Sequence, residues 1–417
     1  MWIAFAVGFA LAAAPTTGAT TGAPTDPEAD ESLTGFKAPS TPISEIPLVG
    51  PPLPADLAVK QAATSAQRGA EQLKMDVVFV QGIQDGLEKV YRRDYAGAKE
   101  YFVRFEAKYP NTAVASVADT LVWQALMLEN FDYRYSTQYW QSSKASRAAL
   151  ERALAIAGND AWEHFLYGAV AGVESIHTIR TGSYLPALQL AFEALDHIQE
   201  TRERAPGFTD LLLADGMYNY WRSVLTMSSK ILPDFGDKRA EGLAQMKQVE
   251  QSGIFLAPAG TLSLTFSFLE EGQYSEALAA CQKNRAKYPD NVINNMITGM
   301  TYIYLRKYPD AIRVFDEIRK DDPTNRRVRY WKGVSLLRSG QTAPAIAELD
   351  AYLGAEYLED WQKASTHWRL GQAYQREKRY ADADAAYTAA TKLDGGSPAK
   401  AALDVLRDQR KKGTIAY

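Results

Sequence analysis

The residues that could carry catalysis or hold a metal ion are few and widely scattered in this sequence. It contains four histidines, at positions 164, 177, 197 and 367, and a single cysteine, Cys281. No two histidines have the i, i+4 spacing that places two imidazoles on one helix face around a zinc ion. One cysteine can form neither a thiolate cluster nor a disulfide within the chain. The sequence therefore predicts no metal site, no cofactor and no catalytic residue.

The motifs of nucleotide-binding and hydrolytic enzymes are missing as well. The sequence has no glycine-rich phosphate loop, no GxGxxG turn that opens a helix and no GxSxG nucleophile turn. The adjacent Glu270 and Glu271 would point in different directions on a helix, so they cannot act as a pair of catalytic carboxylates. A net charge of −4 with 23% charged residues gives no reason to expect nucleic acid or an anionic membrane as partner. Binding without catalysis is favoured.

The elements that would position a binding residue recur with a fixed step between residues 258 and 359. Small residues repeat every 34 positions, and they are Ala277, Ala311 and Ala345, together with Gly299 and Gly333. A period of 34 residues predicts units of two antiparallel helices, none of which buries its apolar face alone. Small side chains are needed where the two helices of a unit cross most closely, because a larger one would overpack the crossing.

Residues that start and stop helices follow the same period. Gly272 and Gly340 stand where the first helix of a unit should end. Pro309 and Pro344 fall in the first turn of a second helix, where the missing N–H does no harm. Asn291 is placed to cap the first helix of the following unit. The agreement of these signals with the small-residue period predicts a stacked helical array.

This pattern resembles the tetratricopeptide repeat (TPR) superfamily. The resemblance implies an all-α fold, a right-handed superhelix (solenoid) of antiparallel TPR-like helix pairs with a C-terminal capping helix, here expected at residues 399–411. It implies a scaffold for binding and no particular reaction. The stretch from Asp210 to Asn291 is also similar to exported bacterial TPR proteins and, more distantly, to the inclusion body clearance protein family. The residues that carry this second resemblance are Tyr218, Tyr220, Leu232, Pro233, Gly236, Asp237, Lys238, Gly242, Leu243, Gly253, Tyr274, Ala277, Leu278, Tyr288, Pro289 and Asn291.

The chain is predicted to have four parts. Residues 1–19 are expected to be a signal peptide, because Trp2–Ala14 is an apolar run too short to span a bilayer that ends in small residues. Residues 20–55, rich in Pro, Thr and Gly, predict a disordered linker. Residues 56–257 should form TPR-like and atypical helix pairs, and 258–417 the C-terminal TPR array with its capping helix. We therefore expect an exported, periplasmic protein that is not inserted in the membrane after the signal is cleaved.

Helices are expected throughout residues 56–257. Residues 79–112 have the spacings of one further repeat. Longer and atypical helices are predicted after it, at 113–130, 137–157, 161–180, 184–204, 211–231 and 238–252. Aromatic residues are dense in this middle segment, and they predict either a helical core or the lining of a ligand pocket.

The TPR resemblance implies a concave groove lined by the first helix of each unit. We expect the protein partner to bind at Phe266, Met296, Met300, Tyr304, Tyr330, Arg338, Trp368 and Arg376. The repeat at 79–112 contributes Val80, Ile83, Leu87, Val90 and Tyr91 to the same groove. The Lys and Asn with which some TPR domains hold a C-terminal carboxylate are absent from the matching positions, so capture of chaperone tails is disfavoured.

An apolar groove of this length has to be covered. Its occupant is either the protein's own helices in a closed superhelix, with residues 210–231 as a candidate, or a helix or extended segment of a partner. The favoured function is a non-catalytic, exported TPR scaffold that binds another protein of the bacterial cell envelope. The alternative is a solute- or lipid-binding protein with an aromatic pocket between the middle helices and the C-terminal array. An accessory domain of an enzyme is a third reading.

Overall fold

The chain is helical wherever the structure, a computed structural model, describes it. Helices α3 to α20 are present and none of the described residues lies in a strand, which confirms the predicted all-α class. The predicted right-handed turn of the superhelix stays a prediction. The expected signal peptide (1–19) and linker (20–55) lie outside the described residues. The structure describes residues 64–130, 134–156, 160–180, 184–228, 236–393 and 396–417.

Two compact units share the described residues. Of the described residues, the first comprises those from 64 to 124 and again those in 137–289, and the second comprises those in 290–417 together with those in 125–136. The boundary that the sequence predicts between residues 257 and 258 concerns where the regular repeats begin, and it stays a prediction.

The first unit is built from helix pairs whose bounds agree with the predicted ones to within a few residues. Its longest pair, α8 and α9, packs closely, and a Cβ atom on Gly168 of α8 would lie 3.2 Å from the carbonyl oxygen of Ala194 and from the side chain of Ile198. The helices are α3 (Ser65–Leu73), α4 (Val77–Tyr91), α5 (Tyr95–Lys108), α6 (Val114–Asn130), α7 (Ser136–Leu154), α8 (Asp160–Arg180), α9 (Tyr184–Arg204), α10 (Leu211–Ser228), α11 (Arg239–Ser252), α12 (Ala257–Glu270) and α13 (Tyr274–Lys287). The last turns of α6 and the start of α7 belong to the second unit.

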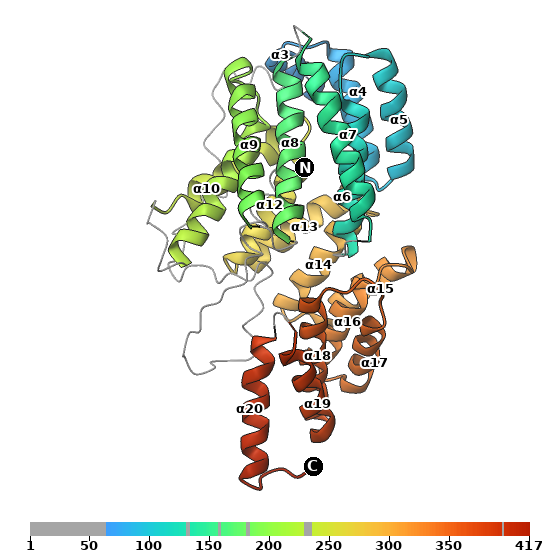
Figure 1. Ribbon diagram of the computed structural model, residues 1–417, viewed down its shortest axis with the longest axis vertical. Helices are drawn as coiled ribbons and strands as arrows, with labels where there is room; N and C mark the ends of the chain where they lie inside the picture. The colour runs from blue at the N-terminus through green and yellow to red at the C-terminus, as the bar shows by residue number, and fades with distance from the viewer. Residues whose placement is uncertain (1–63, 131–133, 157–159, 181–183, 229–235, 394–395) are drawn as a thin grey trace. The chain divides into compact units, whose positions relative to one another are not determined.

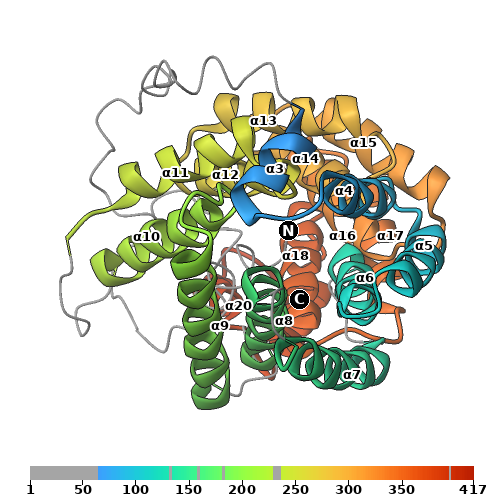
Figure 2. The same cartoon turned by 90° about the horizontal axis from the view of Figure 1, so that it is seen from above.

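The first unit closes on itself, so that its last helices return to its first ones (Figure 2). The Tyr288 hydroxyl donates to the Glu88 carboxylate over 2.9 Å, although the two residues are 200 positions apart. The Tyr91 hydroxyl donates to the carbonyl oxygen of Phe255, also over 2.9 Å. These bonds join α4 to the turn before α12 and to the end of α13. The protein's own helices therefore cover the inner face of α4.

The second unit is a regular stack of helix pairs (Figure 1). Each helix packs on the next, and the first helices α14, α16 and α18 also contact one another in turn. The terminal helix α20 buries Leu403 and Leu406 against the last pair and exposes its opposite side, as predicted for a capping helix. The helices are α14 (Val292–Tyr304), α15 (Tyr308–Asp321), α16 (Arg327–Arg338), α17 (Thr342–Leu353), α18 (Asp360–Arg376), α19 (Tyr380–Thr391) and α20 (Ser397–Lys411).

The two helices of each regular repeat cross closely, as predicted, and the same pair of positions makes the contact in each repeat. A glycine of the first helix packs against a large side chain 16 positions later, in the second helix. A Cβ atom on any of these glycines would lie within 3.0 Å of that side chain. The pairs are Gly86 with Phe102, Gly299 with Phe315, Gly333 with Leu349, and Gly371 with Tyr387. Ala277, Ala311 and Ala345, the other small residues of the period, are completely buried.

The turn after each first helix needs a residue with positive φ. Gly272 and Gly340 supply it, with φ of 72° and 83°. Arg306 stands 34 residues after the first and 34 before the second, and it adopts a φ of 57° in the same turn. The chain thus keeps the backbone geometry of the repeat even where the residue is not glycine, at a conformational cost that glycine would not have.

Candidate binding site

The structure separates the eight predicted groove residues into an inner and an outer group. Phe266, Met296, Met300 and Tyr330 are buried, whereas Tyr304, Arg338 and Trp368 are half-buried and Arg376 is exposed. Phe266 belongs to the first unit and the other seven to the second. The buried four are packed as core, so the surface that a partner could reach in the second unit lies towards its C-terminal end. That these residues bind a partner stays a prediction.

We call this accessible surface the C-terminal strip, and define it as Arg338, Trp368, Gln372 and Arg376. Its residues lie on α16 and α18, and the Arg376 guanidinium ties the two helices together by donating to the carbonyl oxygen of Leu337. Trp368 packs partly on the core formed by α19 and α20. The strip is aromatic and basic, and it combines a flat apolar surface with two arginine side chains.

Burial of Tyr330 is explained by Arg327, which the TPR resemblance also implies as a groove position. Arg327 is buried, donates to the Tyr352 hydroxyl over 3.1 Å and lies 4.9 Å from the centre of the Tyr330 ring. Its guanidinium is also 5.4 Å from the ring centre of Trp331 and the same distance from that of Trp361. A cation among several aromatic faces is attracted by each of them. Tyr330 is therefore part of a packed cluster and not an open groove wall.

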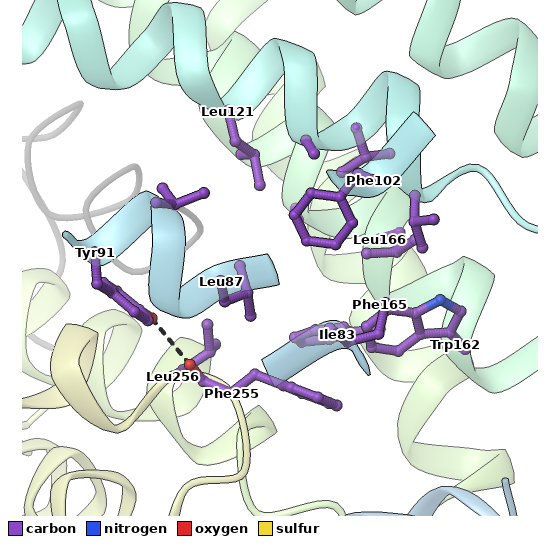
Figure 3. A pocket seen from close by; sticks show the side chains of 15 residues that line it. Ile83, Leu87, Tyr91, Phe102, Leu121, Trp162, Phe165, Leu166, Phe255 and Leu256 are labelled. Carbon is purple, nitrogen blue, oxygen red and sulfur yellow. Dashed lines mark hydrogen bonds between the residues drawn. The ribbon is translucent and has the colours of Figure 1, made fainter. Parts of the chain in front are cut away.

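An apolar cavity of about 70 Å³ lies within the first unit. Figure 3 shows side chains of α4, α5, α6 and α8 and of the turn before α12 converging on it. Four of the five groove positions predicted for the repeat at 79–112 line this cavity, namely Ile83, Leu87, Val90 and Tyr91. The cavity is therefore what remains of that predicted groove after α6 and α8 have covered it.

The cavity does not lie where the sequence analysis placed an aromatic ligand pocket, and that pocket stays a prediction. The sequence placed an aromatic ligand pocket between the middle helices and the C-terminal array. All residues that line the observed cavity belong to the first unit, so it is not that pocket. The density of aromatic residues in the sequence could not give the position of a cavity. A tryptophan such as Trp162 has the same sequence surroundings whether it packs in a core or lines a pocket.

One wall of the cavity is held by a buried carboxylate. Asp210 accepts hydrogen bonds from the backbone N–H groups of Ile254 and Phe255, each over 2.8 Å. Burial raises the pKa of Asp210 from its ordinary value of 3.8 to about 6, although these hydrogen bonds act in the opposite direction. The indole N–H of Trp162, whose ring lies next to that of Phe255, is buried and has no hydrogen-bond partner among the described residues.

A charged cluster joins α7, α8 and α9 in the first unit. The Arg147 guanidinium pairs with the carboxylates of Glu174 and Glu193, and its hydrogen bond to Glu193 lowers the pKa of that carboxyl. His164 and His197 lie with their Nδ1 atoms 2.8 Å apart, although the sequence separates them by 33 residues. Burial lowers the pKa of His197. Among the described residues no group of three or more side chains is arranged to hold a metal ion.

The family comparison matches residues 298–357 to the tetratricopeptide repeat model. Those residues span the end of α14 and all of α15, α16 and α17, a stretch that holds the pairs Gly299–Phe315 and Gly333–Leu349. Solved structures with similar folds include MamA MSR-1 (23% identity, TM-score 0.31, covering 37% of this chain and 87% of that one). The P58(IPK) TPR domain is another; it has 15% sequence identity and a TM-score of 0.27, and the match covers 80% of this chain and 99% of that one.

Curated relatives are similar over a shorter stretch. ER membrane protein complex subunit 2 of Xenopus tropicalis is 32% identical over 116 residues, which is 28% of this chain and 37% of the relative. Subunit 2-A of Xenopus laevis is 31% identical over the same length. The chain thus spans little more than a third of the length of the curated relatives it matches.

These relatives overturn the expected periplasmic location. They are frog proteins named for a complex of the endoplasmic reticulum membrane, and an exported bacterial protein was expected. The expectation depended on the apolar run Trp2–Ala14, and an apolar run alone is not specific for export. Within the described residues no helix is both long and apolar enough to cross a bilayer.

The resemblance to exported bacterial TPR proteins and to the inclusion body clearance family stays a prediction. The repeat itself does not, because the matched residues, the 34-residue step and the glycine pairs coincide. This chain carries tetratricopeptide repeats.

Proposed function

We propose that this protein is a non-catalytic scaffold that binds another protein through the C-terminal strip. Tetratricopeptide repeats serve in general as protein-interaction scaffolds, and their stacked first helices offer an extended surface. The observation that carries the proposal is the accessibility of Arg338, Trp368 and Arg376, while Phe266, Met296, Met300 and Tyr330 are buried. An accessible tryptophan flanked by arginines has the composition of a binding hot spot.

The chemistry of the strip indicates the kind of partner. Arginine forms paired hydrogen bonds with carboxylates, and the indole ring of Trp368 offers a flat surface for an apolar side chain. A partner segment with one apolar residue flanked by Asp or Glu would match both. The similarity to subunits of a multiprotein complex supports a partner that is itself part of an assembly.

The experiment is a crosslinked pull-down with the full chain from the source cells, read by mass spectrometry, followed by calorimetric titration with the recovered protein. The test variant changes Trp368→Ala and Arg376→Ala together. The matched control changes Val405→Ala and Arg313→Ala, an exposed apolar residue and an exposed arginine outside the strip. Circular dichroism verifies that both variants are folded.

We expect the control to bind as the native chain does and the test variant to bind at least about 30-fold more weakly, the loss typical of a hot spot of 2 kcal/mol. Equal affinity of both variants would show that the partner does not use the strip. Failure to recover any partner with the native chain would count against the scaffold function itself.

A further inference from the structure

We propose that the apolar cavity of the first unit binds one small, uncharged, apolar molecule, of the size of a single aromatic ring or a short alkyl chain. This goes beyond the scaffold function, because the cavity and the C-terminal strip share no residue. The proposal depends on the lining of the cavity, its opening and the support of its walls.

The lining offers a water molecule few partners, because its side chains are apolar apart from the indole of Trp162 and the hydroxyl of Tyr91. Among the described residues that line the cavity none is charged. The hydroxyl of Tyr91 already donates to the carbonyl oxygen of Phe255. A bound water needs two to four polar partners, and an apolar cavity without them stays dry and accepts apolar ligands.

The size of the cavity limits the ligand. One water-sized position takes about 10–15 Å³ measured in the same way, so 70 Å³ offers roughly five to seven such positions. A benzene ring has six heavy atoms and a pentyl chain has five. A charged head group finds no counter-charge among the lining side chains, and its burial would be unfavourable. The ligand is therefore an uncharged hydrocarbon or a part of a molecule with that character.

The cavity has a defined opening. Leu87, Leu121 and Ala169 are half-buried, whereas the other lining residues are buried. These three come from α4, α6 and α8, so three helices meet at the mouth. Ala169 is the smallest of the three, and a longer side chain at this position would close the entrance without altering the deeper walls.

The walls are supported from behind, which keeps the cavity from collapsing. Trp162 packs edge-on against Phe79, with ring centres 5.8 Å apart, and lies 5.3 Å from the ring centre of Phe255. Phe165 packs edge-on against Phe208 at 5.0 Å. Asp210 fixes the backbone of Phe255. Large rings that are held on their outer sides cannot move inward without losing these contacts.

The test uses ¹⁹F NMR of fluorobenzene with the full chain. We expect broadening of the fluorine signal by the native protein, and its reversal by excess toluene. Ala169→Leu should reduce the bound fraction at least tenfold. Ala191→Leu is the matched control, because Ala191 is also half-buried on a helix of the first unit but does not line the cavity, and it should bind as the native chain does.

A second filling variant keeps the test decisive. Ala118→Leu adds the same three carbon atoms inside the cavity, so it should abolish binding if Ala169→Leu does not fold. Equal broadening by the native chain and a folded filling variant would overturn the proposal, as would native broadening that toluene does not reverse or no broadening at all. The Trp368→Ala/Arg376→Ala variant should bind fluorobenzene as the native chain does. The experiment therefore tests ligand binding in the cavity separately from partner binding at the C-terminal strip.

Discussion

Asp210 holds the backbone of Phe255 with a carboxylate that is completely buried. The two residues are 45 positions apart, and Asp210 Oδ2 accepts from the Phe255 N–H over 2.8 Å. The other carboxylate oxygen does the same for Ile254. A residue just before α10 thereby fixes the turn that precedes α12. This turn also receives the hydroxyl of Tyr91, so one buried acid organises the place where the first unit closes.

The raised pKa of Asp210 predicts a dependence of stability on pH. Its folded-state pKa of about 6 lies above the ordinary 3.8, so the native state holds the proton more tightly. This stabilisation is fully present below pH 3.8 and is lost as pH rises through 6, a change of about 3 kcal/mol. In urea denaturation, the advantage of the native chain over Asp210→Asn should shrink by that amount between pH 4 and 8. Parallel pH profiles of the two proteins would contradict the assignment.

The contact between Gly299 and Phe315 predicts that alanine at position 299 destabilises the protein, although helix propensity alone would favour alanine over glycine. Alanine favours a helix over glycine by about 1 kcal/mol, but a Cβ on Gly299 would overlap the Phe315 ring. Gly299→Ala should therefore lower the unfolding free energy by about 1–3 kcal/mol in thermal or urea denaturation. Adding Phe315→Leu should recover part of the loss. The control is Gly207→Ala, which has open space around its Cβ position and should change little. A stabilised Gly299→Ala would disprove the close crossing.

The turn at Arg306 predicts a stabilising substitution. Its φ of 57° is unfavourable for a residue with a side chain, and glycine occupies the equivalent positions one repeat before and one repeat after. Arg306→Gly should raise the unfolding free energy by up to about 1 kcal/mol, and Gly340→Arg should lower it by a similar amount. The pair of denaturation midpoints is the measurement. Shifts of the same sign in both variants would show that the positive φ of this turn does not determine the effect on stability.

The ion pair between the buried Arg239 and Glu271 predicts a large loss of stability when only the arginine is replaced. It pairs with Glu271 at 2.9 Å, and Glu271 is only 5% exposed and has its pKa raised by burial. Arg239→Met should lower the unfolding free energy by about 3–5 kcal/mol, because the buried Glu271 carboxylate loses the counter-charge of Arg239. Arg239→Met with Glu271→Met should lose clearly less. Arg313→Met, which breaks an exposed pair with Asp310, should stay within about 1 kcal/mol of the native chain. Equal losses in the single and double variants would contradict this account.

Local signals made the helices predictable. The glycines that end first helices and the prolines in first turns act within a few residues, and the 34-residue step repeats them, so α12 to α19 lie where the sequence placed them. The same holds for the long pair α8 and α9. Each of these signals depends on the local backbone geometry or on a neighbouring side chain. None of them requires knowledge of residues far away in the sequence.

The site was less predictable, because its contacts join residues far apart in sequence. Nothing near Asp210 indicates that it binds the backbone of Phe255, and nothing near Arg327 indicates the ring of Trp361. Likewise, His164 and His197 meet only because α8 and α9 pack antiparallel. The groove rule assigned Met296 and Tyr330 to one face of their helices, but the burial of both depends on what packs against that face. A periodic pattern identifies a face and does not say what covers it.

The glycine contacts also bear on how the array can change in length. Every contact joins two helices of one repeat, and the connection between α17 and α18, at residues 354–359, lies outside any of them. Four extra residues have been accommodated before α18, yet Gly333 with Leu349 and Gly371 with Tyr387 keep their spacing of 16 on either side. Insertions between repeats, or the gain and loss of whole repeats, are therefore open to evolution without a new core, whereas a single residue added within a repeat is not.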